Sequence, residues 1–230
     1  MRFGPRPVRH PSARAAAARI FFERRMPRAE VGATMAVELS ERGQAMESEY
    51  RPIIDFWFRE LTPRQWFTAG GPELDELIRT RFGTQVKAAR RGALDHWAAS
   101  PRGRLALIIL LDQFPRHVYR NTPDAYASDA KALALAKQGI ELGLDEQLTL
   151  AEQQFFYLPL MHAEDKGVQA LSVERFTALR DAAEAVLGFA LGHRDVVDRF
   201  GRFPHRNTVL GRASSADEEA FLASGENTLR

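Results

Sequence analysis

From Glu47 onward, apolar residues recur every three or four positions through most of the chain, which is the period of an α-helix. The pattern predicts helices over residues 47–61, 72–92, 104–114, 123–142, 149–161 and 172–200, and a last short helix that starts at Ser215 and ends before Gly225. The period-two alternation of a strand and the Asn-Gly pair of a tight hairpin do not compete with this pattern. We therefore expect an all-α protein.

The helix predicted over 104–114 contains seven consecutive apolar residues, Leu105–Leu111, and so has no polar side for water. It should lie at the centre, and Pro115 should stop or bend it. Thr149-x-x-Glu152 and Ser215-x-x-Glu218 have the form of capping boxes, and Pro159 should kink the helix over 149–161. We expect about six or seven helices, stacked as antiparallel hairpins around helices 104–114 and 149–161.

Residues 1–46 show no sustained apolar period and are rich in Arg, Ala and Pro. One interpretation is a transit-like leader, because such leaders are rich in Arg and poor in acids. The other is a start codon placed too far upstream, with Met26, Met35 or Met46 as the true beginning. The misplaced start is favoured because Arg19 interrupts every apolar run that could form between residues 15 and 22. We predict that 1–46 is a disordered leader or a misplaced start, and that 47–225 is a single helical domain.

The charge of the chain is divided unevenly between its two ends. Residues 1–28 contain eight Arg and one acid, which gives +7, whereas the whole chain carries +2, so residues 29–230 carry −5. A mildly acidic domain argues against a general nucleic-acid surface. The chain has no Cys, which excludes disulfides and agrees with a reducing cytoplasm. Its longest apolar run has seven residues, against about 18 for a spanning helix, so we expect no membrane segment.

Three strings stand out: LALIILLDQFPRHVYR (105–120), FFYLPLMHAED (155–165) and HRDVVDRFGRFPHRN (193–207). Together with IIDFWF (53–58), they resemble the bacterial domain-of-unknown-function 924 family over about Tyr50 to Phe221. The resemblance implies an all-α, tetratricopeptide-like helical fold. It implies no activity, because the family is named for lacking one. The Arg-rich head departs from the family pattern, which favours the misplaced start.

Each of these strings places polar residues at or beyond the end of an apolar run. Asp112 follows the seven apolar residues of a helix that should be buried, where an unpaired carboxylate is strongly disfavoured. Arg116, Arg120, Arg202 and Arg206 are the available cations. A structural Asp–Arg clamp is favoured over a catalytic acid. His193 falls on the apolar side of its helix, where a histidine is more often a satisfied core residue than a base.

The polar segments also contain residues of the types that can bind zinc or a di-metal centre: His162, Glu164, Asp165, His193, His205 and Asp112. However, the sequence has no HExxH motif and no paired ExxH motif, and the neighbouring arginines would repel a cation. No P-loop and no dinucleotide glycine motif is present. We therefore predict neither a metal nor a cofactor.

Arginines suit an anion better, because a guanidinium binds carboxylate or phosphate through two hydrogen bonds. The leading hypothesis is a cytoplasmic helical scaffold that binds an anionic small molecule or an acidic peptide through the side chains of Arg116, Arg202, His205 and Arg206. The alternative is an enzyme of unknown class that uses His162 or His193 as acid or base beside Asp112. An enzyme needs a cleft with a histidine and a carboxylate within hydrogen-bond reach, whereas a scaffold needs an exposed groove.

The sequence does not determine whether the three polar segments form one pocket. In a simple antiparallel stack, helices 104–114 and 149–161 end on the same side, and helix 172–200 ends on the other. The oligomeric state is left open as well.

Overall fold

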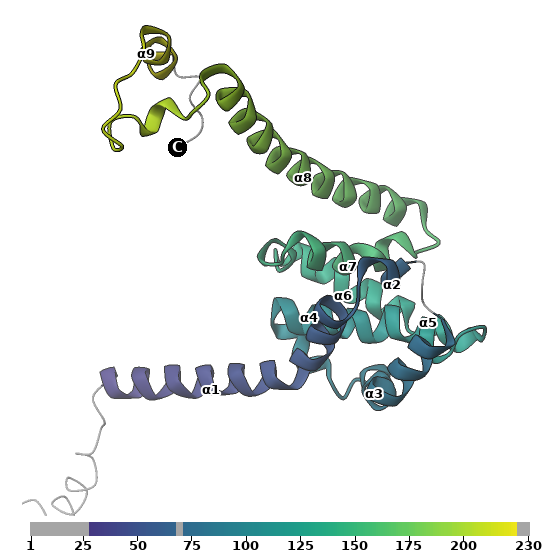
Figure 1. Cartoon of the computed structure of the whole chain (residues 1–230). Coiled ribbons are helices and arrows are strands. Elements are labelled where there is room, and N and C mark those ends of the chain that lie inside the picture. Colours follow the sequence, from purple (N-terminus) through teal and green to yellow (C-terminus); the bar gives the residue numbers. More distant parts are fainter. Residues whose placement is uncertain (1–27, 68–70, 225–230) are drawn as a thin grey trace, which may run out of the picture. The chain divides into compact units, whose positions relative to one another are not determined.

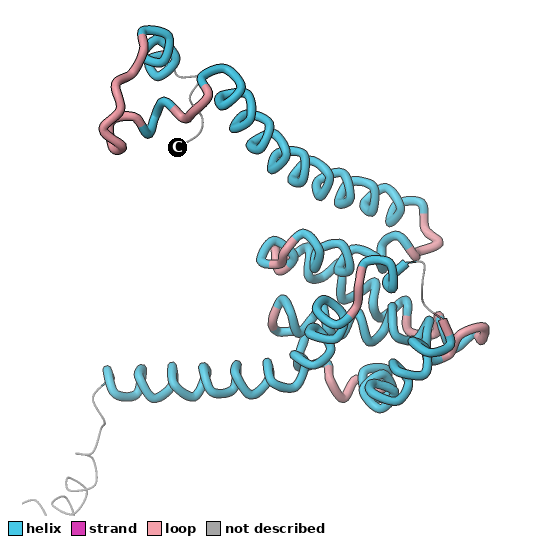
Figure 2. Tube along the Cα trace, in the orientation of Figure 1, coloured by secondary structure: helices cyan, strands magenta, loops and turns pink. Residues whose placement is uncertain are grey.

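The computed structural model describes the backbone of residues 28–67 and 71–224, and the side chains from Glu41 onward within these ranges (Figure 1). This part of the chain consists of helices, turns and loops, with no strand (Figure 2). The prediction of an all-α protein is therefore confirmed. The chain divides into two units, residues 1–49 and 50–230. The N-terminal part of the predicted leader, residues 1–27, lies outside the described residues.

The described residues form nine α-helices. They are α1 (Arg28–Asp55), α2 (Pro63–Phe67), α3 (Pro72–Arg90), α4 (Pro101–Ile108), α5 (Phe114–Val118), α6 (Asp129–Glu141), α7 (Leu150–Met161), α8 (Lys166–Phe200) and α9 (Ala216–Ala223). The apolar period begins only near Glu47, yet α1 begins at Arg28, so its first half is a helix without an apolar stripe. Whether residues 1–46 are a leader or follow from a misplaced start stays a prediction.

The predicted central helix is α4 together with the π-helical turn that follows it, Ile109–Gln113. Every side chain from Leu105 to Asp112 is fully buried. The helix contacts α6 and α7, and its continuation contacts α3. A helix that is apolar on all sides is stable only when neighbours cover all of it, which is the arrangement found here.

The chain stays helical through Pro115. The α-helix widens into the π-turn at Ile109–Gln113 and resumes as α5, with Pro115 in its first turn. Proline has no N–H to donate to the carbonyl four residues earlier, which is that of Leu111. The hydroxyl of Ser128 donates to this carbonyl at 2.7 Å. Ser128 thus supplies the hydrogen bond that Pro115 cannot give to this buried carbonyl.

Local start signals account for three helix beginnings. The capping boxes at Thr149 and Ser215 are both formed, as predicted. Helix α8 begins at Lys166, earlier than the predicted Ser172, because the carboxylate of Asp165 accepts a hydrogen bond from the N–H of Val168. Asp165 is therefore the N-cap of α8 and does not belong to α7.

The predicted apolar stripe of α8 is only partly covered. Ser172 and Val196 are buried, but Val186, Leu187 and Phe189 are 56–64% exposed. Beyond α8, the chain packs on itself: the rings of Phe200 and Phe221 lie 5.1 Å apart. We call residues 193–224 the C-terminal segment.

Two helical glycines provide a matched test of the packing. A Cβ on Gly139 of α6 would lie 2.8 Å from Cδ of Arg104 and collide with the ring of Phe156, whereas a Cβ on Gly83 of α3 would meet nothing within 4 Å. We expect Gly139→Ala to lower the free energy of unfolding by about 1–3 kcal/mol and Gly83→Ala to raise it by roughly 0.5–1 kcal/mol. Urea denaturation of both variants measures the difference. Equal values would show that α6 does not pack closely on α4 and α7.

Candidate functional site

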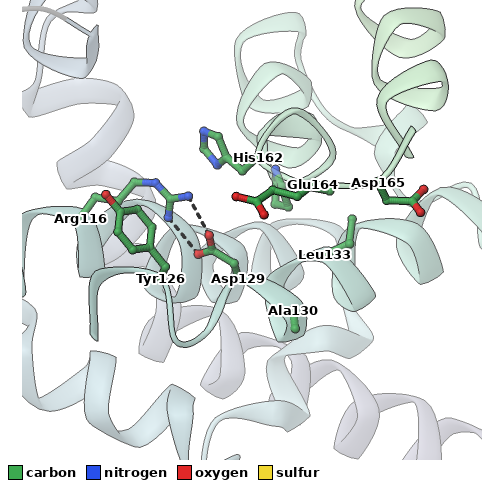
Figure 3. A pocket seen from close by; sticks show the side chains of 10 residues that line it. Arg116, Tyr126, Asp129, Ala130, Leu133, His162, Glu164 and Asp165 are labelled. Atoms are coloured by element: carbon green, nitrogen blue, oxygen red, sulfur yellow. Dashed lines mark hydrogen bonds and ion pairs between the residues drawn. The ribbon is translucent and has the colours of Figure 1, made fainter. Parts of the chain in front are cut away.

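Two of the three polar segments meet at a cavity of about 670 Å³ between α6 and the end of α7 (Figure 3). Its walls are formed by Arg116, Tyr126, Asp129, Ala130, Leu133, Pro159, His162, Ala163, Glu164 and Asp165. The volume is in the range of about 300–1,000 Å³ that is usual for small-molecule pockets. We call this space the His162 cavity.

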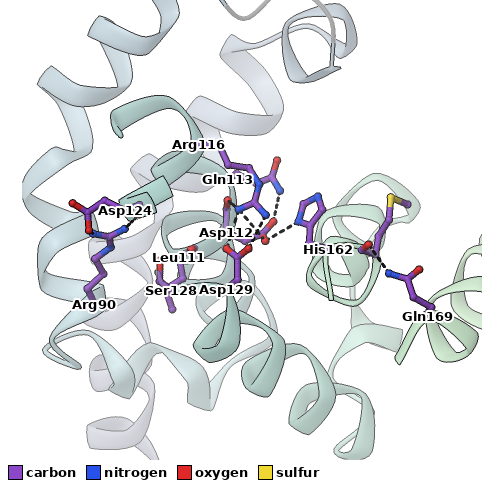
Figure 4. A network of polar contacts seen from close by, with 11 residues as sticks. Arg90, Leu111, Asp112, Gln113, Arg116, Asp124, Ser128, Asp129, His162 and Gln169 are labelled. Carbon is purple, nitrogen blue, oxygen red and sulfur yellow. Dashed lines mark hydrogen bonds and ion pairs between the residues drawn. The ribbon is translucent and has the colours of Figure 1, made fainter. Parts of the chain in front are cut away.

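His162, which lines this cavity, is hydrogen-bonded to Asp112, which lies behind the wall (Figure 4). Nδ1 of His162 lies 2.8 Å from Oδ1 of Asp112, which is fully buried. A carboxylate can only accept, so Nδ1 carries a proton, and in the neutral imidazole Nε2, on the other side of the ring, is then an acceptor. The imidazole is 27% exposed. A buried carboxylate therefore fixes the tautomer of the His162 ring.

Two further side chains hold Asp112 in place. The amide of Gln113 donates to its Oδ2, and a guanidinium nitrogen of Arg116 lies 3.4 Å from its Oδ1. The same guanidinium donates to the backbone carbonyl of Asp112 at 2.5 Å. The predicted Asp–Arg clamp is therefore present, but it lies within one helical turn, from the π-turn to α5, and does not join two separate helices.

The main partner of Arg116 is Asp129, at the start of α6. The two side chains make a bidentate contact, with N–O distances of 3.0 and 2.9 Å. Burial acts to lower the pKa of Arg116, but the hydrogen bond with Asp129 and the nearby charge of Asp112 hold this pKa above its ordinary value. The guanidinium also lies 5.4 Å from the ring centroid of Tyr126. Its charge is matched by two carboxylates.

The charges around the His162 cavity are predominantly acidic. Asp129, Glu164 and Asp165 line it, and Arg116 is the one Arg or Lys side chain in its described wall. Glu164 extends from the α7–α8 loop toward the space between Arg116 and His162 (Figure 3). This wall favours a ligand that is neutral or positively charged, and it does not favour an anion.

The remaining predicted anion ligands belong to the C-terminal segment. Arg202 donates to both carboxylate oxygens of Glu218 on α9, at 2.6 and 2.8 Å, and to the carbonyl of Ala213 at 3.0 Å. The hydrogen bond from Arg202 is the largest of the contacts that lower the pKa of Glu218 to about 2. The guanidinium of Arg206 stacks 4.4 Å above the ring of Phe203, and the ring of His205 lies 5.7 Å from the same ring.

His193, the other candidate base, is separate from Asp112 in its contacts. Its Nδ1 lies 2.7 Å from the carbonyl oxygen of Phe189, one turn earlier in α8, and its ring contacts Phe203. Within the described residues, no hydrogen bond or ion pair is found between the C-terminal segment and Asp112, Arg116 or His162. The structure thus brings together polar residues of the strings 105–120 and 155–165.

A second histidine–carboxylate pair was not predicted. His117 lies 2.8 Å from Asp75 on α3, and Arg120 makes a bidentate contact with the same carboxylate. Burial acts to raise the pKa of Asp75, but its hydrogen bonds with Arg120 and His117 hold this pKa below its ordinary value. A signal was present in the sequence, because Asp75 precedes the core residues Ile78 and Phe82 by three and seven positions and so lies on the buried face.

Among the described residues, no group of three or more His, Asp or Glu side chains is arranged to hold a metal ion. No described helix combines the length and the apolar character that crossing a membrane requires.

The fold and the site together define an all-helical protein in which a histidine, paired with a buried carboxylate, lines a small-molecule-sized cavity. The chain belongs to the family of bacterial proteins of unknown function called DUF924, whose pattern it matches over residues 53–226. It is similar to a solved structure, a protein of unknown function, ATU0120, from Agrobacterium tumefaciens, with 36% sequence identity and a TM-score of 0.55. That similarity covers 78% of this chain and 99% of the other. No curated protein matches this chain.

Proposed function

We propose that the protein is an enzyme that performs general acid–base chemistry on a small neutral or cationic molecule in the His162 cavity. One observation carries the proposal: a fully buried carboxylate holds Nδ1 of a partly exposed histidine that lines a cavity large enough for a substrate. A histidine fixed in this way presents an unprotonated Nε2, which is the geometry required of a general base.

In this proposal His162 takes a proton from water or from the substrate and returns it to the leaving group. Asp112 does not touch the substrate; it positions the ring and stabilises the imidazolium that forms. Among its described residues, the wall of the cavity contains no Ser, Thr or Cys that His162 could activate as a nucleophile, so water is the nucleophile in this proposal. Hydrolysis of an ester or an amide is the class of reaction that fits best.

The test compares turnover of a panel of neutral and cationic chromogenic esters and amides by the parent protein and two variants. In His162→Asn, the side-chain amide can still donate to Asp112, but Nε2 is lost, and we expect kcat/KM to fall roughly 10²- to 10⁴-fold. In the matched control His193→Asn, we expect no change. Equal turnover by His162→Asn and the parent protein would contradict the proposal.

The scaffold hypothesis is supported by fewer of its residues. It assigns the binding of an anion to Arg116, Arg202, His205 and Arg206. Arg116 and Arg202 are each matched by carboxylates. Arg206 makes no ion pair with any described residue, and its guanidinium lies above Phe203. Anion binding by the C-terminal segment therefore depends on Arg206 together with His205.

A further inference from the structure

A second, smaller cavity of about 220 Å³ lies between α2 and α5, the helix that carries Arg116. Its walls are Gln65, Trp66, Phe67, Gln113, Arg116, His117 and Arg120. We call it the basic cavity. It is smaller than the pockets of about 300 Å³ or more that usually hold drug-sized molecules, so its size fits one ionic group or a very small molecule.

The charges of the basic cavity are opposite to those of the His162 cavity. Among the described residues, its wall contains two guanidiniums, one imidazole and two amides, but no carboxylate. The acids that pair with these cations, Asp75, Asp112 and Asp129, lie outside the wall. A wall rich in donors and free of carboxylates favours an oxyanion.

Both guanidiniums are held in place and still have N–H groups to donate. Arg120 uses Nε and Nη2 on Asp75, and Arg116 uses Nη1 and Nη2 on Asp129. Neither Nη1 of Arg120 nor Nε of Arg116 makes a hydrogen bond within the described residues. Since the side chains are already ordered by their carboxylate partners, a ligand does not have to supply the cost of ordering them.

The amide and aromatic side chains complete this arrangement. Oε1 of Gln65 accepts hydrogen bonds from the N–H and the hydroxyl of Thr62, both at 2.9 Å, so its NH₂ group is the part left for a ligand. The amide of Gln113 donates to Asp112. The rings of Trp66 and Phe67 form the apolar part of the wall and lower the local dielectric constant, which strengthens a charged contact.

We propose that the basic cavity binds a small oxyanion, such as phosphate or the carboxylate of a small acid, through Arg116, Arg120 and Gln65. This site is distinct from the His162 cavity and does not depend on the reaction proposed there. Arg116 lines both cavities, so an anion in one lies next to the residue that supports Asp112 in the other.

The test is the thermal unfolding of the full chain in sodium phosphate and in sodium chloride of the same ionic strength. At a phosphate concentration of about five times its Kd, we expect Tm to rise by roughly 2–4 °C above the chloride value. Gln65→Glu keeps the acceptor for Thr62 but places a negative charge in the cavity, and we expect it to abolish the rise. Arg79→Gln removes an exposed positive charge outside the cavity and should keep the rise.

Two further variants separate this site from the other proposals: His162→Asn and Arg206→Gln should both retain the full response. No rise above chloride in the parent protein, or an undiminished rise in Gln65→Glu, would overturn the proposal. Amide chemical shifts of the parent protein, recorded during phosphate titration, give a second measurement that needs no variant. They should change around Gln65, Gln113 and Arg120, and changes confined to the C-terminal segment would place the anion at Arg206 instead.

Discussion

Replacing Asp112 by alanine is expected to lower the free energy of unfolding by about 3–5 kcal/mol. The carboxylate is fully buried and is contacted by His162, Gln113 and Arg116. Without it, the amide of Gln113 and Nδ1–H of His162 lose their acceptor in a region that water does not reach. Arg116 keeps Asp129, so the loss should fall toward the lower end of the range.

Chemical denaturation of Asp112→Ala and a surface control measures this loss. Asp124 is a suitable control, because its side chain is 66% exposed and its contact with Arg90 is 3.8 Å long. We expect Asp124→Ala to change the free energy of unfolding by at most about 1 kcal/mol. If the two alanine variants unfold at the same denaturant concentration, the carboxylate of Asp112 is in water and the buried pair does not exist.

The features that sequence predicted well are those determined by residues close together in the chain. The unbroken run Leu105–Leu111 identified the buried helix, because a helix with no polar side has to be covered. The capping boxes at Thr149 and Ser215 depend on side chains only three residues apart. The start of α8 was predicted at residue 172, too late by six residues, because the apolar period was followed and Asp165 was not recognised as an N-cap, although it has the residue type of one.

The consequences of Pro115 were harder to predict. Its effect depends on where the freed carbonyl of Leu111 finds a donor, and the donor, Ser128, is in another element. A sequence pattern shows that a hydrogen bond is lost, but it does not show what replaces it. The π-turn that results brings Asp112 into the fully buried part of the helix.

The candidate site was predicted only in part, again because a sequence pattern does not show which distant residues become partners. Asp112 and His162 were identified because each is a polar residue at the end of an apolar run, and such a residue needs a partner. Arg116 was named as one of four cations available to Asp112, and Asp129 was not expected as its partner, since Asp129 begins an alanine-rich helix and resembles any acid in a first helical turn. The pairing of such distant side chains is determined by how helices pack, which a periodic pattern does not specify.

Replacing Asp112 by asparagine is expected to remove most of the activity proposed for His162 while leaving the volume of the side chain unchanged. In the parent protein, one oxygen of Asp112 accepts from Nδ1–H of His162 and the other accepts from Gln113. Asparagine has only one oxygen. If its NH₂ group faces His162, Nδ1 becomes the acceptor and the proton moves to Nε2, which can then no longer act as a base.

The expected fall in kcat/KM is roughly 10²- to 10⁴-fold, close to that of His162→Asn. The ¹⁵N chemical shifts of His162 give a readout that a loss of stability alone does not move, because they distinguish a ring protonated on Nδ1 from one protonated on Nε2. The parent protein should show the Nδ1–H form and Asp112→Asn the Nε2–H form. Asp129→Asn, which weakens the contact with Arg116 but does not touch the ring, should retain the Nδ1–H form. An unchanged tautomer together with unchanged turnover in Asp112→Asn would show that the carboxylate does not position His162.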